Sequence, residues 1–230
     1  MWNGKMKALT FSYDDGTLQD RRLVEIFNKY GLKATFNLNS GLFGYRGRLN
    51  VEGVLTETNK VFDEEIKGLY DGHEVAGHTL HHPTLNQIGD EDVIRQVEDD
   101  RKYLQELVGY NVCGMAYPCG GVDDRVVKLI EDNTGIRYAR TTLSTYNYEL
   151  QEDLLRFNPT ISHYEFDKMV ELGEEFLRLE PDRPQLYYIW GHSYEFDTYQ
   201  TWERFEEFCK MMSNHDDIFY GTNYQVLFEK

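Results

Sequence analysis

Strand-like and helix-like segments alternate along almost the whole chain, and this alternation most limits the fold. Strands are expected at residues 7–13, 33–38, 74–76, 112–117, 136–140 and 185–190. Helices are expected at residues 18–30, 61–70, 90–108, 122–133, 164–179 and 198–212, and residues 154–161 fit either type. Such a pattern is typical of parallel β/α units. The sequence therefore predicts an α/β fold with about seven parallel strands.

The 230 residues contain no internal repeat and no linker rich in proline or serine. This predicts a single domain over residues 1–230, with residues 39–59 as a polar excursion over its rim. About seven β/α units in so short a chain favour an incomplete (β/α) barrel, whose active site would lie at the C-terminal ends of the strands.

Two of the expected helices have clear apolar faces. Asp90 is a plausible N-cap for the helix over residues 90–108, and Gly31 is expected to end the helix over residues 18–30. The apolar faces consist of Val93, Val97, Leu104 and Leu107 or Val108 in one helix, and of Trp202, Phe205, Phe208 and Met212 in the other. We interpret both as core packing.

The charge balance restricts the partners. Asp plus Glu number 40 against 24 Lys plus Arg, giving a net charge of −16. Such a chain repels polyanions, so we expect neither nucleic acid nor an anionic membrane as a partner. A neutral or cationic substrate fits better, and the sequence leaves the oligomeric state open.

Cysteine usage and the N-terminus bear on localisation. Cys113, Cys119 and Cys209 form no Cys-x-x-Cys pattern, and an odd count does not suggest a disulfide framework. No apolar signal region and no run of about 20 apolar residues occurs. The expectation is a cytoplasmic protein in a reducing compartment.

Candidate catalytic residues follow the expected strands at the same end. Asp14 and Asp15 come after the first strand, His78 after the third, and His192 after a late one. His82 lies about one helical turn from His78, so both imidazoles can reach one ion if the segment is helical or tightly looped. A carboxylate and two imidazoles are a usual ligand set for catalytic zinc. The alternative is a solvated, His-rich loop.

The acidic pair also has two interpretations. Asp14, Asp15 and Gly16 could simply build a turn that caps the next helix. Adjacent carboxylates repel, however, unless a cation or a proton separates their roles. One Asp would then bind metal and the other would serve as a base. His192 could donate a proton to a leaving amine, or it could be a hydrogen-bonded structural residue.

Four segments resemble motifs of the polysaccharide deacetylases, the NodB-homology or carbohydrate esterase family 4 group. The resemblance spans roughly residues 7 to 192, in the family's order. The segments are Thr10-Phe11-Ser12-Tyr13-Asp14-Asp15-Gly16, Gly77-His78-Thr79-Leu80-His81-His82-Pro83, Tyr117-Pro118-Cys119-Gly120 and Ile189-Trp190-Gly191-His192.

This resemblance implies a distorted (β/α) barrel that removes N- or O-acetyl groups from a carbohydrate with the help of a divalent metal. It implies that Asp15, His78 and His82 hold the metal, that Asp14 is the base and His192 the acid, and that the backbone N–H of Cys119 helps to stabilise the oxyanion. The ligand types favour Zn²⁺ and leave Co²⁺, Ni²⁺ and Mn²⁺ open.

The chain departs from the family pattern at two places. Ala116 stands where the third motif usually has an Arg that orients the base. Arg140 could reach the same space from the next unit, or it could form a surface or structural ion pair. The fourth motif, Asp-x-x-Asp-Trp, has no counterpart between Arg137 and Pro159, so Glu195, Asp197, another carboxylate or nothing would orient the acid.

Substrate choice is the most open part of the prediction. Tyr117, Trp190 and Tyr194 lie beside motif residues and could line the cleft, although such residues are more often core. One alternative function is a related metal-dependent amidohydrolase acting on a small cyclic amide or ureide. A second alternative is an inactive carbohydrate-binding protein.

Overall fold

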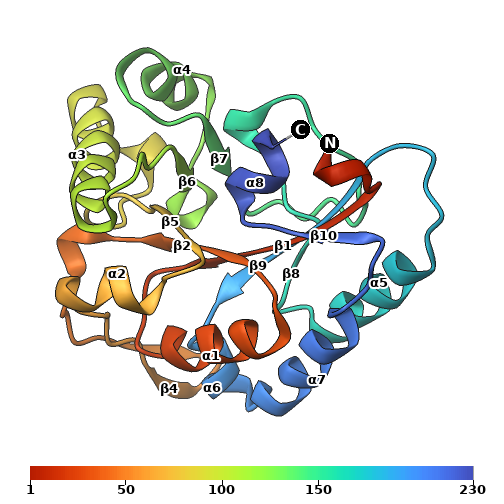
Figure 1. Ribbon diagram of the computed structural model, residues 1–230. Coiled ribbons are helices and arrows are strands. Elements are labelled where there is room, and N and C mark those ends of the chain that lie inside the picture. The colour runs from red at the N-terminus through yellow and green to blue at the C-terminus, as the bar shows by residue number, and fades with distance from the viewer. Residues whose placement is uncertain (230) are drawn as a thin grey trace.

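A parallel sheet that curls into an incomplete barrel forms the centre of the computed structural model, which describes residues 1–229 (Figure 1). Seven strands follow one another in the order β7-β6-β5-β2-β1-β9-β8, and β10 also pairs with β1. Every pairing within this sheet is parallel. The predicted α/β fold, a distorted barrel of about seven parallel strands, is confirmed.

The strands are shorter or longer than expected by a few residues at most. Their bounds are β1 Lys7–Asp14, β2 Ala34–Leu38, β5 Glu74–Gly77, β6 Gly114–Ala116, β7 Tyr138–Arg140, β8 Ile161–Ser162, β9 Gln185–His192 and β10 Ile218–Tyr220. The ambiguous residues 154–161 divide into a 3₁₀ turn, η6 Leu154–Arg156, and the start of β8.

Helices surround the outside of this sheet (Figure 1). They are α1 Asp20–Tyr30, α2 Ile66–Leu69, α3 Asp90–Val108, α4 Asp124–Asn133, α5 Phe166–Arg178, α6 Glu195–Tyr199, α7 Trp202–Met212 and α8 Asn223–Phe228. The helix expected over residues 198–212 is two helices, α6 and α7, because Gln200 between them adopts a left-handed conformation with φ 53°. Gly31 ends α1 in the same conformation, as expected.

The expected apolar faces are buried, but the predicted N-cap of α3 is wrong. Val93, Val97, Leu104 and Val108 of α3 and the four predicted residues of α7 all lie in the core. The N-cap of α3 is Gly89, and Asp90 is the first helical residue. Its carboxylate accepts a hydrogen bond from Arg125 of α4 at 2.6 Å instead of capping the helix.

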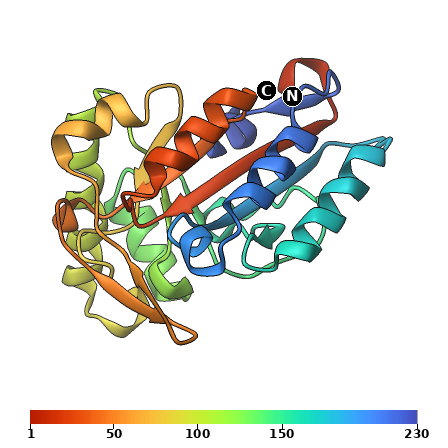
Figure 2. The same cartoon turned by 90° about the horizontal axis from the view of Figure 1, so that it is seen from below.

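The polar excursion forms an antiparallel hairpin that the sequence did not predict. Its strands are β3 Arg48–Val51 and β4 Val54–Glu57, which project beyond the main sheet (Figure 2). The loops at its base are tied to the end of β1, since the N–H of Leu18 donates to the carbonyl of Asn59 and that of Val61 to the carbonyl of Gly16. The hairpin thus brings the residues at its base beside Asp15.

The C-terminal segment packs against the barrel at the end where the strands begin. Asn223, at the start of α8, is completely buried. Its side chain accepts a hydrogen bond from Thr10 and donates one to Tyr188, while its backbone N–H donates to Thr35. These contacts with three strands hold the C-terminal segment against the sheet. The N-terminal turn, η1 Trp2–Gly4, lies against α8, where the indole N–H of Trp2 donates to the carbonyl of Val226 (Figure 1).

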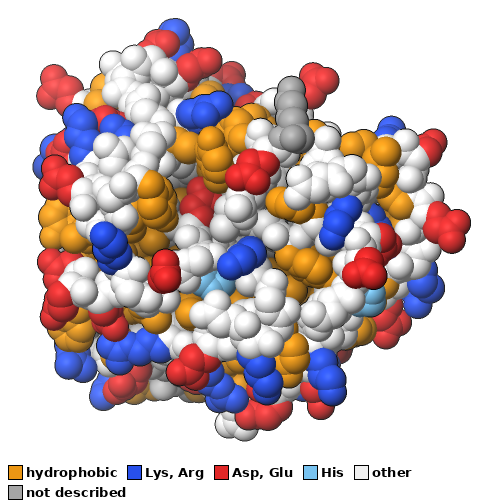
Figure 3. Space-filling model, in the orientation of Figure 1, with side chains coloured by type: hydrophobic (Ala, Val, Ile, Leu, Met, Phe, Trp, Pro, Cys, Tyr) orange, Lys and Arg blue, Asp and Glu red, His pale blue; other side chains and the backbone are white. Residues whose placement is uncertain are grey.

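Acidic and basic side chains are interspersed over the visible face rather than gathered in one patch (Figure 3). Within residues 1–229, no helix has the length and apolar character needed to cross a membrane.

Candidate active site

Three neighbouring strands bring polar side chains together at their carboxyl ends. Asp14 is the last residue of β1, and in the sheet register it lies beside Asn37 of β2 and His192 of β9. Side chains at register partners point to the same face of a sheet. The three side chains therefore meet on the inside of the barrel, although they are far apart in sequence.

Asp15, His78 and His82 form a group that fits a metal ion. One potential ligand atom from each lies within 4.8 Å of the other two. Asp15 Oδ1 is 3.7 Å from His82 Nε2. The segment between the two histidines is a tight loop, not a helix, because Thr79 and His82 have φ values of 65° and 60°. His81 points away from the group, toward Gln96.

The surroundings of His78 suit a metal ligand. Its ring is buried, and Nδ1 donates to the carbonyl of Ala116 at 2.8 Å, which leaves the lone pair on Nε2 facing the site. Burial lowers the pKa of His78 to about 4, so the imidazole is neutral at pH 7. A neutral ring fixed by a hydrogen bond from its other nitrogen is what a metal-binding histidine needs.

Asp14 has a different environment from its neighbour. Its carboxylate is buried and accepts hydrogen bonds from Asn37 at Oδ1 (2.8 Å) and from Arg140 at Oδ2. Burial alone would raise its pKa, but the Arg140 guanidinium and two nearby imidazoles outweigh burial and hold the pKa below its usual range. Asp14 is therefore ionised at neutral pH.

Arg140 lies beside Ala116 on the neighbouring strand. The two residues are register partners in the β6–β7 pair. Besides Asp14, the guanidinium donates to Ser12 Oγ at 3.2 Å and stacks over the ring of Trp190, 4.4 Å from its centroid. The structure places this side chain against Asp14 and not at the surface, and its role in orienting a base stays a prediction.

His192 lies near Oδ2 of Asp15, whereas His82 lies near Oδ1. Its Nε2 is 4.0 Å from Asp15 Oδ2, and its Nδ1 is 3.3 Å from Glu195 Oε2. Burial would lower the pKa of His192, but the charges of Glu195 and the two aspartates raise it to about 9. The carboxylate beside His192 is Glu195. Asp197 is exposed and accepts hydrogen bonds from Trp202 and Gln19 instead.

Lys60 is a site residue that no sequence pattern singles out. It lies at the base of the β3–β4 hairpin, and its Nζ donates to the carbonyl of Asp15 at 2.8 Å and lies 3.1 Å from Asp15 Oδ1. Asp15 has a φ of 81°, which is unusual for a residue other than glycine. Burial opposes ionisation of Asp15, but Lys60 and the imidazoles around it hold its pKa well below the usual range.

The predicted substrate-lining residues divide into two groups. Tyr117 does not line a cleft, because it is completely buried and its hydroxyl donates to the carbonyl of Leu155. Trp190 is partly exposed and its indole N–H is among the buried polar groups without a hydrogen-bond partner. Tyr194 is 7% exposed, with its ring 5.1 Å from that of His192.

Cys119 lies in a short turn, η5 Pro118–Gly120, that follows β6. Its side chain is exposed and its φ is 55°. The turn begins two residues after Ala116, whose carbonyl orients His78. The backbone of Cys119 thus lies in the loop that follows this contact, at the carboxyl end of the strands.

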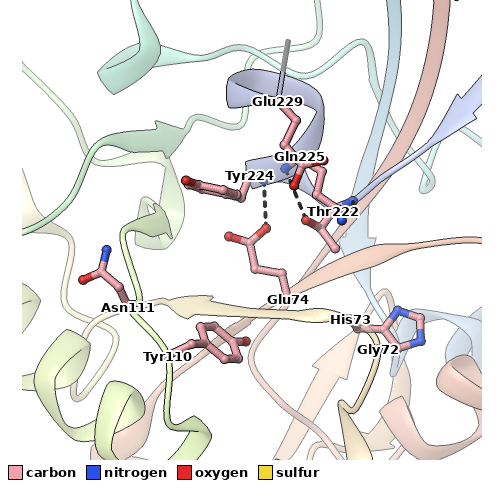
Figure 4. A pocket seen from close by; sticks show the side chains of 9 residues that line it. All are labelled: Gly72, His73, Glu74, Tyr110, Asn111, Thr222, Tyr224, Gln225 and Glu229. Carbon is pink, nitrogen blue, oxygen red and sulfur yellow. Dashed lines mark hydrogen bonds between the residues drawn. The ribbon is translucent and has the colours of Figure 1, made fainter. Parts of the chain in front are cut away.

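A hollow of about 470 Å³ lies at the other end of the barrel, between the start of β5 and α8 (Figure 4). Glu74 in its wall accepts hydrogen bonds from Tyr138, Thr35 and the N–H of Tyr224, so it ties α8 to the sheet. His78 follows the opposite end of the same strand. The ligand group and both candidate proton carriers lie at the carboxyl end of the strands, away from this hollow.

The chain is similar to known carbohydrate-modifying proteins. The family model described as "Polysaccharide deacetylase" matches residues 3–139. The peptidoglycan-N-acetylmuramic acid deacetylase PdaC of Bacillus subtilis is 25% identical over 124 residues, which is 54% of this chain but only 23% of that protein.

Two solved structures share the fold over nearly the full chain. A putative polysaccharide deacetylase from Mycobacterium smegmatis gives a TM-score of 0.69 at 16% identity, covering 97% of this chain and 89% of that one. A family 4 carbohydrate esterase pseudoenzyme from Bacillus anthracis gives 0.58 at 18% identity, covering 100% and 68%. At these identities the likeness supports the fold alone.

Proposed function

Because the chain belongs to the polysaccharide deacetylase family, we propose that it is a metal-dependent hydrolase that removes acetyl groups from an N- or O-acetylated carbohydrate. The observation that carries this proposal is the convergence of a two-histidine, one-carboxylate group with a separate buried carboxylate at one end of the sheet. The proposal also assigns a role to each residue of the site.

Asp15, His78 and His82 would hold the divalent ion, with Zn²⁺ the best match to one carboxylate and two imidazoles. Their spacing supports this assignment, as does the hydrogen bond that leaves His78 Nε2 free to ligate. When bound, the ion supplies Lewis-acid chemistry, polarising the acetyl carbonyl and acidifying water.

Asp14 would act as the general base. Its carboxylate is ionised, and its Oδ2 lies 4.0 Å from His78 Nε2, next to the ligand group. Arg140 and Asn37 hold both of its oxygens, which fixes its orientation. The two adjacent aspartates therefore have distinct partners, which suits separate roles in base catalysis and metal binding.

His192 would act as the general acid that protonates the leaving amine or alkoxide. Its raised pKa keeps the ring protonated at neutral pH before the reaction, and its Nε2 faces Asp15 rather than solvent. The backbone N–H of Cys119 would stabilise the negative charge on the acetyl oxygen in the tetrahedral intermediate. The exposed part of Trp190 and the ring of Tyr194 would contact the sugar.

Acetate release tests the proposal. Purified protein is analysed for bound metal and assayed on chitin oligomers, peptidoglycan fragments and simple acetyl esters. A pseudoenzyme of the same fold is known, so an inactive protein is the competing outcome. Bound metal with no acetate released from any of these substrates would favour that alternative, and hydrolysis of ureides alone would favour the amidohydrolase.

A further inference from the structure

His163, which follows β8, occupies a buried position behind the proposed acid. It is 3% exposed, and its ring contacts the rings of Tyr13 and Phe196, with centroids 5.3 and 4.3 Å away. Gly191 makes this position possible, because a Cβ at Gly191 would lie 2.6 Å from the imidazole. Because residue 191 is glycine, the ring of His163 fits against β9 directly beside His192.

Both nitrogens of His163 have polar partners. Nδ1 is 2.9 Å from the hydroxyl of Tyr13, and Nε2 is 2.7 Å from Glu195 Oε2. Packing alone would be satisfied by a leucine or a phenylalanine among these aromatic rings. A buried imidazole with two partners instead suggests that its hydrogen bonds are needed.

Glu195 connects His163 to the acid. The oxygen that accepts from His163 also accepts the backbone N–H of His192 at 3.0 Å and lies 3.3 Å from His192 Nδ1. Burial opposes ionisation of Glu195, but the two histidines hold its pKa well below the usual range. The carboxylate carries no proton of its own, so it accepts hydrogen bonds from Nε2 of His163 and from the backbone N–H of His192.

The direction of each hydrogen bond follows. His163 donates from Nε2 to Glu195, and its Nδ1 faces the Tyr13 hydroxyl. His192 makes its hydrogen bond to Glu195 through its backbone N–H, while its Nδ1 lies 3.3 Å from the same oxygen, within ion-pair distance but without a hydrogen bond. The Nε2 proton of His192, which faces Asp15, is then the one available for transfer. Tyr13 directly precedes Asp14, so this chain of contacts also joins the strand of the base to the loop of the acid.

We propose that His163 is a positioning residue of this site, which anchors Glu195 so that Glu195 holds the ring and the Nδ1 proton of His192 in the orientation needed for acid catalysis. This inference rests on the proposed role of His192 as the acid. The polar partners of His163 are Tyr13 and Glu195, and neither belongs to the ligand group.

Steady-state kinetics of three variants with zinc bound test this proposal. His163→Leu removes the donor to Glu195, and His163→Gln keeps an amide that can replace it. We expect His163→Leu to lower kcat by about tenfold or more, with KM and zinc affinity within about twofold of the parent, and His163→Gln to recover most of the loss. His215→Gln, which alters a histidine bonded to Met211, is the matched control and should leave kcat unchanged.

Unchanged kcat in His163→Leu would overturn the proposal, and so would equal losses in the Leu and Gln variants, because that pattern indicates only a packing role. If His163→Leu does not fold, Tyr13→Phe removes only the hydroxyl that bonds Nδ1. That variant should lower kcat in the same direction with KM unchanged, and a kcat equal to that of the parent would count against the inference.

A spectroscopic test does not depend on turnover. In zinc-loaded protein labelled with ¹⁵N-histidine and held at a pH above the pKa of His192, where the ring is neutral, we expect His192 Nδ1 to keep its proton in the parent and in His163→Gln, and to show averaged tautomers in His163→Leu. Identical His192 shifts in the parent and His163→Leu would overturn the proposal. If the parent releases no acetate yet these shifts differ as expected, the proposed function fails while the positioning role stands.

Discussion

Arg140 and Ala116 are register partners in neighbouring parallel strands, and from this position the Arg140 guanidinium reaches the carboxylate of Asp14. The family motif that normally carries an Arg has Ala here, and the next strand supplies the guanidinium from directly beside it. We propose that the charge of the motif is supplied from this neighbouring strand.

Replacing Arg140 tests this relationship. Arg140→Met leaves a buried carboxylate without its cation, which costs about 3–5 kcal/mol when one partner of a buried pair is lost. We expect lower thermal stability and a fall in kcat of about 100-fold because the base is no longer held. Arg137→Met changes an exposed arginine that stacks over Phe228, so it should leave kcat unchanged and lower stability by at most about 1 kcal/mol. Parental kcat in Arg140→Met would refute the assignment.

The base itself is tested by Asp14→Asn. The amide keeps the size of the side chain but cannot accept the proton from water, so we expect kcat to fall by about 10² to 10⁴-fold. Zinc content should stay near that of the parent, because Asp14 is not among the proposed ligands. Elemental analysis beside the kinetics distinguishes the two roles, and normal turnover in this variant would exclude Asp14 as the base.

Replacing a proposed metal ligand should remove the metal as well as the turnover. His78→Ala and His82→Ala each remove one imidazole of the group, so metal content and turnover should be lost together. His81→Ala is the matched control, since His81 points toward Gln96 and should be dispensable for metal binding. Full metal occupancy in His78→Ala would contradict the proposed ligand set.

Much of the site follows from the sequence because strand ends in a parallel sheet meet at one edge. The positions of Asp14, Asp15, His78 and His192 depend only on that rule and on correct strand limits. Lys60 could not be predicted in this way. It reaches Asp15 through a hairpin whose path across the rim depends on tertiary contacts, and no local pattern marked it as buried.

Lys60 leads to a prediction about metal affinity. Its ammonium lies 3.1 Å from a carboxylate oxygen of Asp15 and would repel a divalent ion bound there. We expect Lys60→Met to bind zinc more tightly by about tenfold or more, the scale of other effects from residues around metal ligands. Titration against a competing chelator measures this, with Lys33→Met as a control, since the Lys33 ammonium bonds the carbonyl of Gly72 and not the site. Weaker binding would show that positioning of Asp15 outweighs the repulsion.

A buried acid near the site gives a pH-dependent stability. Burial raises the pKa of Asp20 from 3.8 to about 7, although Ser193 and Tyr70 donate hydrogen bonds to it. Between these values the folded protein keeps a proton that the unfolded chain releases, so the free energy of unfolding falls as the pH rises toward 7. A tenfold difference in proton affinity between the two states corresponds to about 1.4 kcal/mol of that free energy.

Asp20→Asn should therefore show a smaller decrease in melting temperature than the parent between pH 5 and pH 8. Asp100 has a pKa raised to about 7 by burial and contributes in the same direction in both proteins, so the difference between the two curves isolates Asp20. Parallel curves would show that Asp20 does not titrate in this range.

The sequence predicts the fold class, but it does not predict the C-terminal elements or the N-cap of α3. The period of the apolar residues marked α3 and α7, and buried runs marked β1 and β9. The strand β10 and the helix α8 escaped prediction because they are short and are stabilised by contacts such as those of Asn223 with β1 and β2. Asp90 was wrong as a cap because a neighbouring helix supplies Arg125 as a partner.

The most direct test of the proposed function is acetate release before and after removal of metal. The protein is assayed on N-acetylglucosamine oligomers as purified, after exhaustive treatment with a chelator, and after addition of Zn²⁺. We predict that release is lost on chelation and restored by zinc, while Asp14→Asn with equal zinc content stays inactive. Full release from the chelated protein, or none from the zinc-loaded parent on any acetylated substrate, would contradict the proposal.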